Sequence, residues 1–427
     1  MTAPSRLCII GLGYVGLPLA VALARHFPVI GLDANPGRVA EIQRGVDCNL
    51  EVKAESLRID TLRVTADAAQ AAGCDVYIIT VPTPVDSSNK PDLTAVRAAC
   101  GTVGRLLTPG AIVVLESTVY PGVTEEVCGP ALEAASGLVC GKDFFLGYSP
   151  ERINPGDREH TVERITKVVA GQTPEVAQRL ARIYGAINEG KVFVARSIKT
   201  AEAAKVIENA QRDINIAFIN EVTVIFNKLG LSIFDVLDAA RTKWNFLPFT
   251  PGLVGGHCIG VDPYYLADCA HRLGHNPAVI LAGRQINDDM SAYFAQKIAG
   301  LLELGGGARP ARIRVLGLTF KENVPDLRNS KVADLCRTLA QTGARIDIHD
   351  PLADADDARH EFGLDLLGTL DGAAGYDCVV GAVPHREYLA LTARDFERLL
   401  KPGGMVADIK GMWRSLELPA TLRRWQV

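Results

Sequence analysis

Gly11-Leu12-Gly13-Tyr14-Val15-Gly16 stands directly after the apolar run Arg6-Leu7-Cys8-Ile9-Ile10, and this junction decides the fold. The apolar run predicts a buried parallel strand, and Leu17 to His26 predicts the helix that follows the glycine turn. Val29-Ile30-Gly31-Leu32-Asp33 predicts a second strand that ends in an acid. The order of strand, glycine turn, helix, strand and acid is the full context of a dinucleotide-binding unit, which a glycine triplet alone does not establish.

Each glycine of this turn has a physical task. Gly11 permits the tight turn, Gly13 lets the backbone approach a pyrophosphate, and Gly16 permits close packing of helix against strand. Tyr14 and Val15 lie between the last two glycines, at a helix N-terminus, where amide groups and the helix dipole favour an anion. We therefore expect all five residues to bind the cofactor.

Two side chains beyond the turn bear on which cofactor is bound. Asp33 can accept hydrogen bonds from ribose hydroxyls and would repel a 2′-phosphate, so the sequence predicts NAD rather than NADP. Arg38 either reaches the adenosine side of the cofactor or is a solvated surface charge, and the sequence leaves both interpretations open.

Further strands are predicted at 75–81 and 111–116, each leading into a loop with hydroxyl side chains. In open α/β sheets, ligands gather beyond the carboxyl ends of the strands. Thr83, Ser117 and Thr118 are therefore candidates to face the cofactor and the reacting carbon. Turn capping by the same hydroxyls is an equally good interpretation.

The α/β pattern resumes near the C-terminus, with predicted strands at 313–318, 345–351 and 377–383 and a helix near 331–343. This half has no glycine triplet, so we expect it to hold a nucleotide other than NAD. The sequence thus predicts an α/β fold in which two Rossmann-like, doubly wound domains are joined by a long central helix and a helical dimerisation region. We expect the domains to cover residues 1–196, 197–308 and 309–427.

The central helix is predicted from Ser197 to Leu229, with Ser197 as its N-cap. Lys205 and Asn209 are four residues apart and so share one face of it. They either point into a substrate cleft or are solvated, as lysines on helices commonly are. A long helix between two α/β halves is also a candidate dimer element.

Bulk composition excludes several classes of protein. With 48% hydrophobic residues, 22% charged residues and a net charge of −4, the chain has the composition of a soluble globular protein and no electrostatic case for nucleic acid. No apolar run is long enough for a membrane span, and the start lacks the layout of a secretory signal. The ten cysteines have no metal-type spacing. We expect a cytoplasmic protein without a metal, whose cysteines are mostly reduced and buried.

One cysteine has a different context. Cys258 lies in Gly255-Gly256-His257-Cys258-Ile259-Gly260-Val261-Asp262-Pro263, a glycine-bounded loop with a carboxylate four residues further on. A thiol in such a loop is a candidate nucleophile that a substrate can approach closely. Together with a hydride acceptor it could carry the oxidation of an alcohol past the aldehyde, through a thiohemiacetal to a thioester.

These motifs resemble the UDP-glucose/GDP-mannose dehydrogenase family over essentially the whole chain. The matching segments are the glycine turn, Pro82-Thr83-Pro84, Ser117-Thr118-Val119, Ser149-Pro150-Glu151-Arg152, the helix with Lys205 and Asn209, the Cys258 loop, and Gly317-Leu318-Thr319-Phe320-Lys321 with Arg328. The resemblance implies an NAD domain, a helical dimerising centre and a C-terminal domain that helps to hold UDP, and hence a homodimer that acts on a UDP-sugar.

The resemblance also implies roles for single residues. Cys258 is similar to the family's nucleophile, and Asp262 and Lys205 to the groups that handle the C6 hydroxyl proton and the oxyanion through water positioned by Thr118. Glu151 is similar to the residue that assists thioester hydrolysis. The implied substrate contacts are Glu151, Arg152, Lys205, Asn209, Phe249, Gly252, Gly255, Gly256 and Lys321, and Arg328 resembles a cofactor contact.

Two departures from the glucose-specific members bear on the substrate. Those members place a lysine where this chain has Val261, and a second glutamate where it has Pro155. The stretch from Thr242 to Phe249 resembles the branch that acts on N-acetylated UDP-hexosamines, in particular the Vi-antigen type. The resemblance therefore implies oxidation of UDP-N-acetylglucosamine for a surface polysaccharide. UDP-N-acetylgalactosamine, UDP-N-acetylmannosamine and UDP-glucose remain alternatives, as does a non-catalytic nucleotide-sugar sensor.

Overall fold

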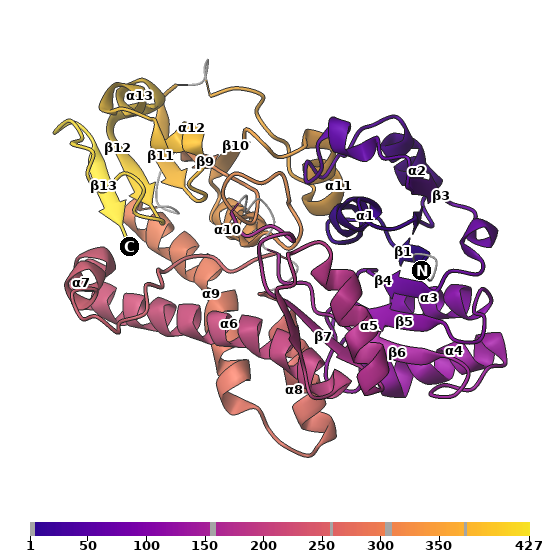
Figure 1. Ribbon diagram of the computed structural model, residues 1–427. Helices are drawn as coiled ribbons and strands as arrows, with labels where there is room; N and C mark the ends of the chain where they lie inside the picture. The colour runs from indigo at the N-terminus through magenta and orange to yellow at the C-terminus, as the bar shows by residue number, and fades with distance from the viewer. Residues whose placement is uncertain (1–4, 154–158, 257–258, 304–309, 371–373) are drawn as a thin grey trace. The chain divides into compact units, whose positions relative to one another are not determined.

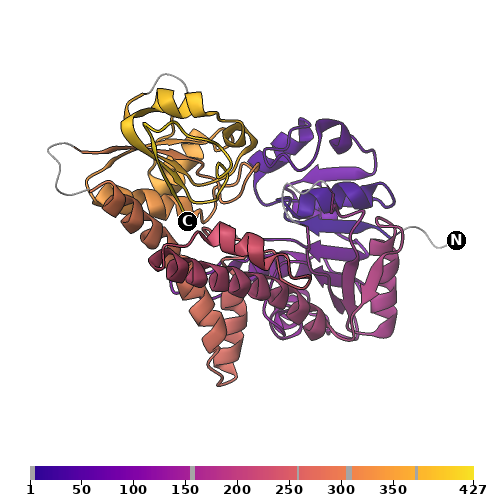
Figure 2. The ribbon, with the colours of Figure 1, turned by 90° about the vertical axis from the view of Figure 1, so that its left-hand side faces the viewer.

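The computed structural model describes residues 5–153, 159–256, 259–303, 310–370 and 374–427. The chain divides into two compact units. The first comprises the residues up to Glu208 together with Tyr264–Asn276, and the second comprises Asn209–Pro263 together with Pro277–Val427. Figure 1 shows the elements of both by chain position, and Figure 2 shows them from a second side.

The first unit is built on an eight-stranded sheet with the order β3-β2-β1-β4-β5-β6-β7-β8. Its pairs are parallel except β6 with β7, which is antiparallel. The strands are β1 (Leu7–Ile10), β2 (Val29–Leu32), β3 (Leu62–Thr65), β4 (Val76–Ile79), β5 (Ile112–Leu115), β6 (Phe145–Tyr148), β7 (Lys167–Gly171) and β8 (Val192–Val194). The predicted strands of the first half are confirmed as β1, β2, β4 and β5.

Helices pack against this sheet, and its central strands are apolar because this packing buries them. All four residues of β1, β2, β4 and β5 are buried, as expected where a parallel sheet is packed on both faces. The helices are α1 (Gly16–Ala24), α2 (Pro36–Gln43), α3 (Thr94–Gly104), α4 (Gly129–Ser136) and α5 (Pro174–Gly185), with short helical turns at Ala54–Leu57, Ala68–Ala71 and Thr124–Cys128.

The long central helix is confirmed as α6 (Ile198–Lys228), with 31 residues. Its predicted N-cap is also confirmed, because the Ser197 hydroxyl accepts a hydrogen bond from the Thr200 amide at 3.1 Å. Three more helices follow: α7 (Ile233–Ala240), α8 (Asp262–Arg272) and α9 (Ala278–Leu301).

The second unit contains a five-stranded parallel sheet with the order β10-β9-β11-β12-β13. Its strands are β9 (Arg312–Leu316), β10 (Arg345–His349), β11 (Tyr376–Gly381), β12 (Leu400–Asp408) and β13 (Arg423–Gln426), and its later helices are α10 (Lys331–Gln341), α11 (Ala355–Phe362), α12 (Arg386–Leu389) and α13 (Ala393–Leu399). The predicted strands of the C-terminal half are confirmed as β9, β10 and β11, and the predicted helix as α10. One buried apolar cluster joins these strands to α7, α9 and α10.

Two whole-chain expectations can be compared with the described residues. Six of the nine described cysteines are buried and all nine are free thiols, which confirms the expectation of mostly buried, unpaired cysteines. Within the described ranges, no helix has both the length and the apolar character needed to cross a membrane.

Candidate active site

Most of the predicted cofactor residues, together with the predicted catalytic residue Glu151, lie at one edge of the first sheet. Each lies just past the carboxyl end of a strand, and β2, β1, β4, β5 and β6 are consecutive, parallel neighbours in the sheet. From one strand to the next they are Asp33, the turn Gly11–Gly16, Thr83, Ser117 with Thr118, and Glu151. This edge is where doubly wound sheets bind nucleotides.

The glycine turn has the geometry that a dinucleotide needs. Gly11 has a φ of +91°, which disfavours other residues. A Cβ on Gly16 would lie 1.8 Å from the carbonyl oxygen of Gly11, so only glycine lets α1 pack so close. A Cβ on Gly13 would meet nothing within 4 Å, which leaves room for a ligand over the exposed backbone. No side chain caps the N-terminus of α1 at Val15, and the helix dipole there favours a pyrophosphate.

Asp33 stabilises the turn from the end of β2. One carboxylate oxygen accepts from the Leu12 amide at 2.7 Å, and the other accepts from the Asn35 amide at 2.8 Å. Each oxygen keeps a second lone pair, so the carboxylate can also accept a ribose hydroxyl. The half-buried Tyr14 completes the predicted turn residues. These residues fit NAD.

Arg38 is not a solvated surface charge. Its side chain is only 10% exposed, and its guanidinium pairs with Asp47 at 2.6 Å and with Glu41 at 2.9 Å. Its Nε donates to the Leu12 carbonyl at 3.0 Å. Arg38 therefore braces the glycine turn from outside, and a contact with the adenosine stays a prediction.

The hydroxyl residues tie two neighbouring loops together. Thr83 donates to the Thr118 carbonyl at 2.8 Å, and Ser117 donates to the Val81 carbonyl at 2.6 Å. Both hydroxyl hydrogens are used in this way, so toward a cofactor these two oxygens can only accept. The loop-capping interpretation is thus confirmed for Thr83 and Ser117, and cofactor contact remains a prediction for Thr83, Ser117 and Thr118.

Glu151 belongs to a buried charge cluster that the sequence did not indicate. Its Oε2 lies 3.3 Å from the Nζ of Lys167, which also lies 3.0 Å from Glu116 Oε2. Its Oε1 accepts from the backbone amides of Arg152 at 2.6 Å and Ile153 at 2.5 Å. Lys167 opens an apolar run and Glu116 follows one, positions typical of surface charges, so neither residue stood out.

The central helix contributes a hydrogen bond, a buried lysine and an ion pair to the predicted site residues. Asn209 donates to the Asp262 carboxylate at 2.5 Å, which brings together a predicted substrate contact and a predicted catalytic residue that are far apart in the sequence. Asp262 and Lys205 are both buried, at 2% and 7% exposure. Arg152 forms an ion pair of 2.7 Å with Glu208 on the first unit's part of α6. A direct contact between Arg152 and substrate therefore stays a prediction.

The loop before the cysteine is held closely by its neighbours in the second unit. Gly252 exchanges two hydrogen bonds with the buried Asn220 amide, of 2.9 and 3.0 Å. A Cβ on Gly255 would lie 2.5 Å from the Asn329 carbonyl oxygen, and one on Gly256 would lie 2.7 Å from the Phe320 ring. Only glycine leaves enough room at these two positions, so contacts with its neighbours determine the path of the loop.

Buried polar groups support Asn220 in turn. Asn220 donates to Asn287 at 2.8 Å, Asn287 donates to Asp213 at 2.8 Å, and Arg284 donates to the same carboxylate at 2.7 Å. All four side chains are at most 2% exposed. Phe249, at the other end of the loop, packs against the apolar cluster of the unit. The network anchors the loop to α6 and α9.

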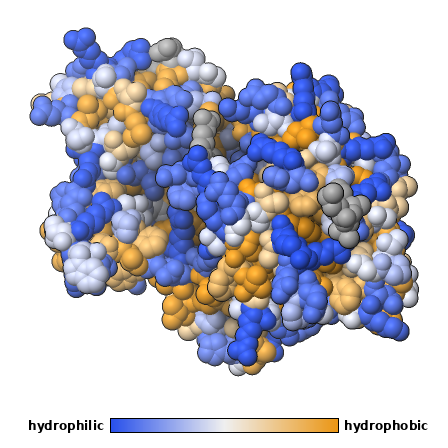
Figure 3. Space-filling model, viewed as in Figure 1, coloured by the Kyte–Doolittle hydropathy of each residue, from blue (hydrophilic) through white to orange (hydrophobic). Residues whose placement is uncertain are grey.

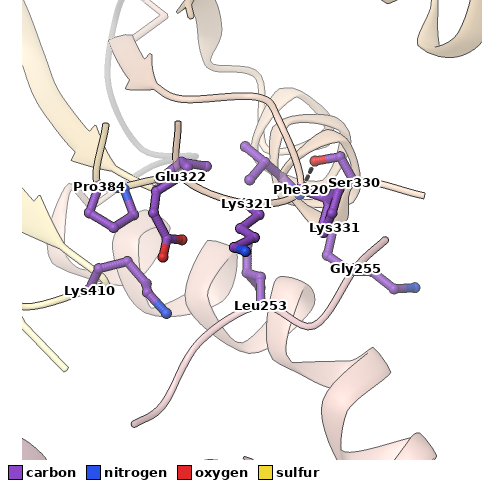
Figure 4. Close-up of a pocket in the computed structure, with 12 residues that line it drawn as sticks. Leu253, Gly255, Phe320, Lys321, Glu322, Ser330, Lys331, Pro384 and Lys410 are labelled. Carbon is purple, nitrogen blue, oxygen red and sulfur yellow. Dashed lines mark hydrogen bonds between the residues drawn. The ribbon is translucent and has the colours of Figure 1, made fainter. Parts of the chain in front are cut away.

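A pocket in the second unit lies against this loop (Figure 4). Its lining is Leu253, Gly255, Phe320, Lys321, Glu322, Ser330, Lys331, Val332, Ala382, Val383, Pro384 and Lys410. Lys410 donates to the Pro251 carbonyl at 3.2 Å, and burial lowers its pKa. Lys331 runs to the other side of Gly255 in Figure 4 and pairs with Asp288 at 2.9 Å. The predicted Lys321 thus shares the pocket with a second lysine, Lys410, and with the carboxylate of Glu322.

Two predicted residues remain. Arg328 forms an ion pair of 2.7 Å with Asp326, and its contact with the cofactor stays a prediction. Cys258 lies outside the described residues, so its role rests on the sequence.

The sequence matches known proteins along its whole length. Models of the UDP-glucose/GDP-mannose dehydrogenase family match residues 5–188 as its NAD binding domain, 199–289 as its central domain and 314–415 as its UDP binding domain. Protein CapL of Staphylococcus aureus is 51% identical over 422 residues, which are 99% of this chain and 99% of that protein.

Two further proteins bear on substrate and fold. UDP-N-acetyl-D-glucosamine 6-dehydrogenase of Pseudomonas aeruginosa is 50% identical over 407 residues, 95% of this chain and 96% of that enzyme. The solved structure of UDP-D-ManNAc dehydrogenase from Pyrococcus horikoshii is similar with a TM-score of 0.87 and 29% identity, over 98% of each chain.

Proposed function

The chain belongs to the UDP-glucose/GDP-mannose dehydrogenase family, and on that premise we propose that it oxidises C6 of a UDP-N-acetylhexosamine, UDP-N-acetylglucosamine foremost, to the uronate. Membership makes it an NAD-dependent UDP-sugar dehydrogenase. The observation that carries the choice of sugar is the 50% identity with the Pseudomonas aeruginosa enzyme over nearly the whole chain. Val261, where glucose-specific members have a lysine, supports the same choice.

The proposed mechanism divides the work among the chain's own residues. NAD, when bound at the glycine turn, supplies the hydride acceptor. Asp262, buried and held by Asn209 at 2.5 Å, accepts the C6 hydroxyl proton, and Lys205 stabilises the oxyanion. The Cys258 thiolate captures the aldehyde, and after the second oxidation the product is bound to it as a thioester. Glu151 assists the attack of water that releases the uronate.

The UDP moiety has a fitting place in the second unit. Lys321 and Lys410 bring two amino groups to the pocket beside the glycine loop, Ser330 adds a hydroxyl, and the Glu322 carboxylate favours the charged form of Lys410 (Figure 4). Ammonium groups and backbone amides are the usual partners of phosphate oxygens. We assign the diphosphate to these lysines, which agrees with the match of this region to the family's UDP binding domain.

We also infer a homodimer through α6. Phe218 and Ile225 of α6 and Leu229, directly after its end, are spaced seven and four residues apart and are 57%, 48% and 66% exposed, so they form one apolar stripe. Figure 3 shows orange residues among blue ones where Figure 1 draws α6 and α9. A second copy covering this stripe would remove it from water. Sedimentation should show a dimer that Phe218→Lys dissociates and the exposed-site control Val139→Lys does not; a dimeric Phe218→Lys protein would refute the assignment.

The deciding experiment counts NADH per sugar. Purified protein with NAD is given UDP-N-acetylglucosamine, its galacto and manno epimers, or UDP-glucose, each in limiting amount. We expect two NADH per sugar, fastest with UDP-N-acetylglucosamine, and no uronate from Cys258→Ala, while the matched control Cys269→Ala keeps its activity. One NADH per sugar, or uronate from Cys258→Ala, contradicts the mechanism. Turnover of UDP-glucose alone contradicts the choice of sugar, and no turnover of any sugar would favour the sensor.

A further inference from the structure

We propose that Lys167 and Glu116 are positioning residues for the hydrolytic step, which hold the Glu151 carboxylate in the orientation from which it takes a proton from water. This inference rests on the proposed thioester mechanism. The three side chains come from three neighbouring strands of the first unit: Glu116 follows β5, Glu151 lies beyond β6, and Lys167 begins β7.

The cluster forms because β7 runs antiparallel to β6. Tyr148 of β6 pairs with Ala170 of β7, and the same register continued past Tyr148 brings Lys167 opposite Glu151. A parallel strand at this position would place its first residue at the other edge of the sheet. The one reversed strand pair thus delivers an ammonium group to the edge that holds the predicted cofactor and catalytic residues.

Hydrogen-bond counting shows what Lys167 does for Glu151. A carboxylate has about four lone-pair sites. The two on Oε1 are taken by the amides of Arg152 and Ile153, at 2.6 and 2.5 Å, and one on Oε2 is taken by Lys167 Nζ at 3.3 Å. The remaining site on Oε2 is the one that can accept a proton from water. Without Lys167 the carboxylate could turn about its last bond and lose this direction.

Glu116 makes the buried lysine possible. Lys167 is 0% exposed, and burial alone would lower its pKa, but the neighbouring Glu116 and Glu151 raise it, so the ammonium form persists. Nζ also lies 5.4 Å from the centre of the Tyr184 ring. Buried ion clusters contribute little to stability because desolvation opposes them. A role in orienting Glu151 explains why a buried ion cluster surrounds this carboxylate.

The step that Glu151 serves is thioester hydrolysis. The water oxygen bonds to the acyl carbon, the carbon–sulfur bond breaks, and the sulfur leaves as the Cys258 thiolate. The proton of the attacking water passes to Glu151. A misdirected Glu151 therefore slows this step and leaves both hydride transfers unaffected, so the thioester accumulates.

The test uses the full-length protein and removes both buried charges at once. Lys167→Met/Glu116→Gln removes one positive and one negative charge together, and Glu151 keeps the two backbone amides on its Oε1, which favours folding. Rapid mixing with NAD and UDP-N-acetylglucosamine should give a burst of two NADH per subunit at the wild-type rate, then turnover slowed about 10- to 100-fold, the scale of a misplaced reacting group. Mass spectrometry of the quenched protein should detect the sugar nucleotide bound to Cys258. Lys191→Met, which removes an exposed ion pair of 3.6 Å, is the matched control and should behave as wild type.

Each outcome bears on one hypothesis. A folded double variant that slows the burst and the turnover equally, with no adduct, overturns the positioning role. If that variant does not fold, Lys167→Gln is used instead: its amide can donate to both carboxylates, so it should turn over without accumulating the adduct, and slowed turnover of this variant with no adduct overturns the positioning role. Failure of the wild type itself to form two NADH per sugar refutes the proposed function instead, independently of any Lys167 variant.

Discussion

Replacement of Asn220 by alanine tests whether the glycine loop is held from behind. Asn220 is 0% exposed and makes three hydrogen bonds, two with the backbone of Gly252 and one with Asn287. Its removal leaves three buried polar groups without their partner. Each such group costs about 1 kcal/mol or more, so the expected loss of unfolding free energy is about 3 kcal/mol.

This loss should be visible in thermal unfolding. For a unit the size of the second one, 1 kcal/mol corresponds to about 2–4 °C, so Asn220→Ala should lower the Tm by about 6–12 °C. The KM for the UDP-sugar should rise as well, because the loop beside the pocket loosens, while NADH affinity stays constant. Circular dichroism melts and steady-state kinetics measure the two effects.

The control lies on the same helix. Asn215 donates to the Gln211 carbonyl at 2.9 Å near the surface, and Asn215→Ala should change the stability by less than about 0.5 kcal/mol. If Asn220→Ala lowers the Tm no more than Asn215→Ala does, the argument from buried hydrogen bonds is wrong.

Three further predictions concern the cofactor turn, the helix start and the pocket. Gly16→Ala should lower the Tm, because its Cβ would lie 1.8 Å from a carbonyl oxygen, whereas Gly13→Ala should keep the Tm and weaken NADH binding measured by fluorescence; the reverse order would refute the assignment. Burial raises the pKa of Glu202 from 4.5 to about 7, so its contribution to stability is present below pH 4.5 and is lost as the pH rises through 7. Relative to wild type, the unfolding free energy of Glu202→Gln should therefore rise by up to about 3 kcal/mol between pH 5 and 8, and its Tm should rise with it. Parallel curves of Tm against pH for the two proteins would contradict this. Calorimetry should show that Lys410→Met weakens UDP binding about 10-fold and that Lys331→Met, whose ammonium is paired 2.9 Å from Asp288, changes it far less; equal losses would remove Lys410 from the site.

Much of the fold could be predicted because its signals are local. Strand, turn and helix follow one another within the first 33 residues, and the glycines there are required by backbone geometry alone. The same holds for the Ser197 cap, which depends on a contact three residues away. The seven strands that were predicted, four in the first sheet and three in the second, are likewise short apolar runs bounded by turns.

The site could be predicted only in part. The motifs indicated Asn209 and Asp262 separately, but their contact joins residues 53 apart and depends on how α6 meets the start of α8. For Arg38 the sequence left two interpretations open, a contact with the adenosine and a solvated surface charge. The structure excludes the solvated charge, because the side chain is only 10% exposed and pairs with two carboxylates. Contacts between distant segments depend on packing, about which a single sequence carries little information.

The sequence by itself determined the NAD-binding turn and the family, because both depend on residue types at short spacings. Only the tertiary structure decided what surrounds Glu151. Lys167 is a charged residue at the head of an apolar run, and nothing in its neighbourhood along the chain indicates burial. It meets Glu116 and Glu151 because β7 pairs antiparallel with β6, and the order and direction of strands in a sheet are properties of the whole unit.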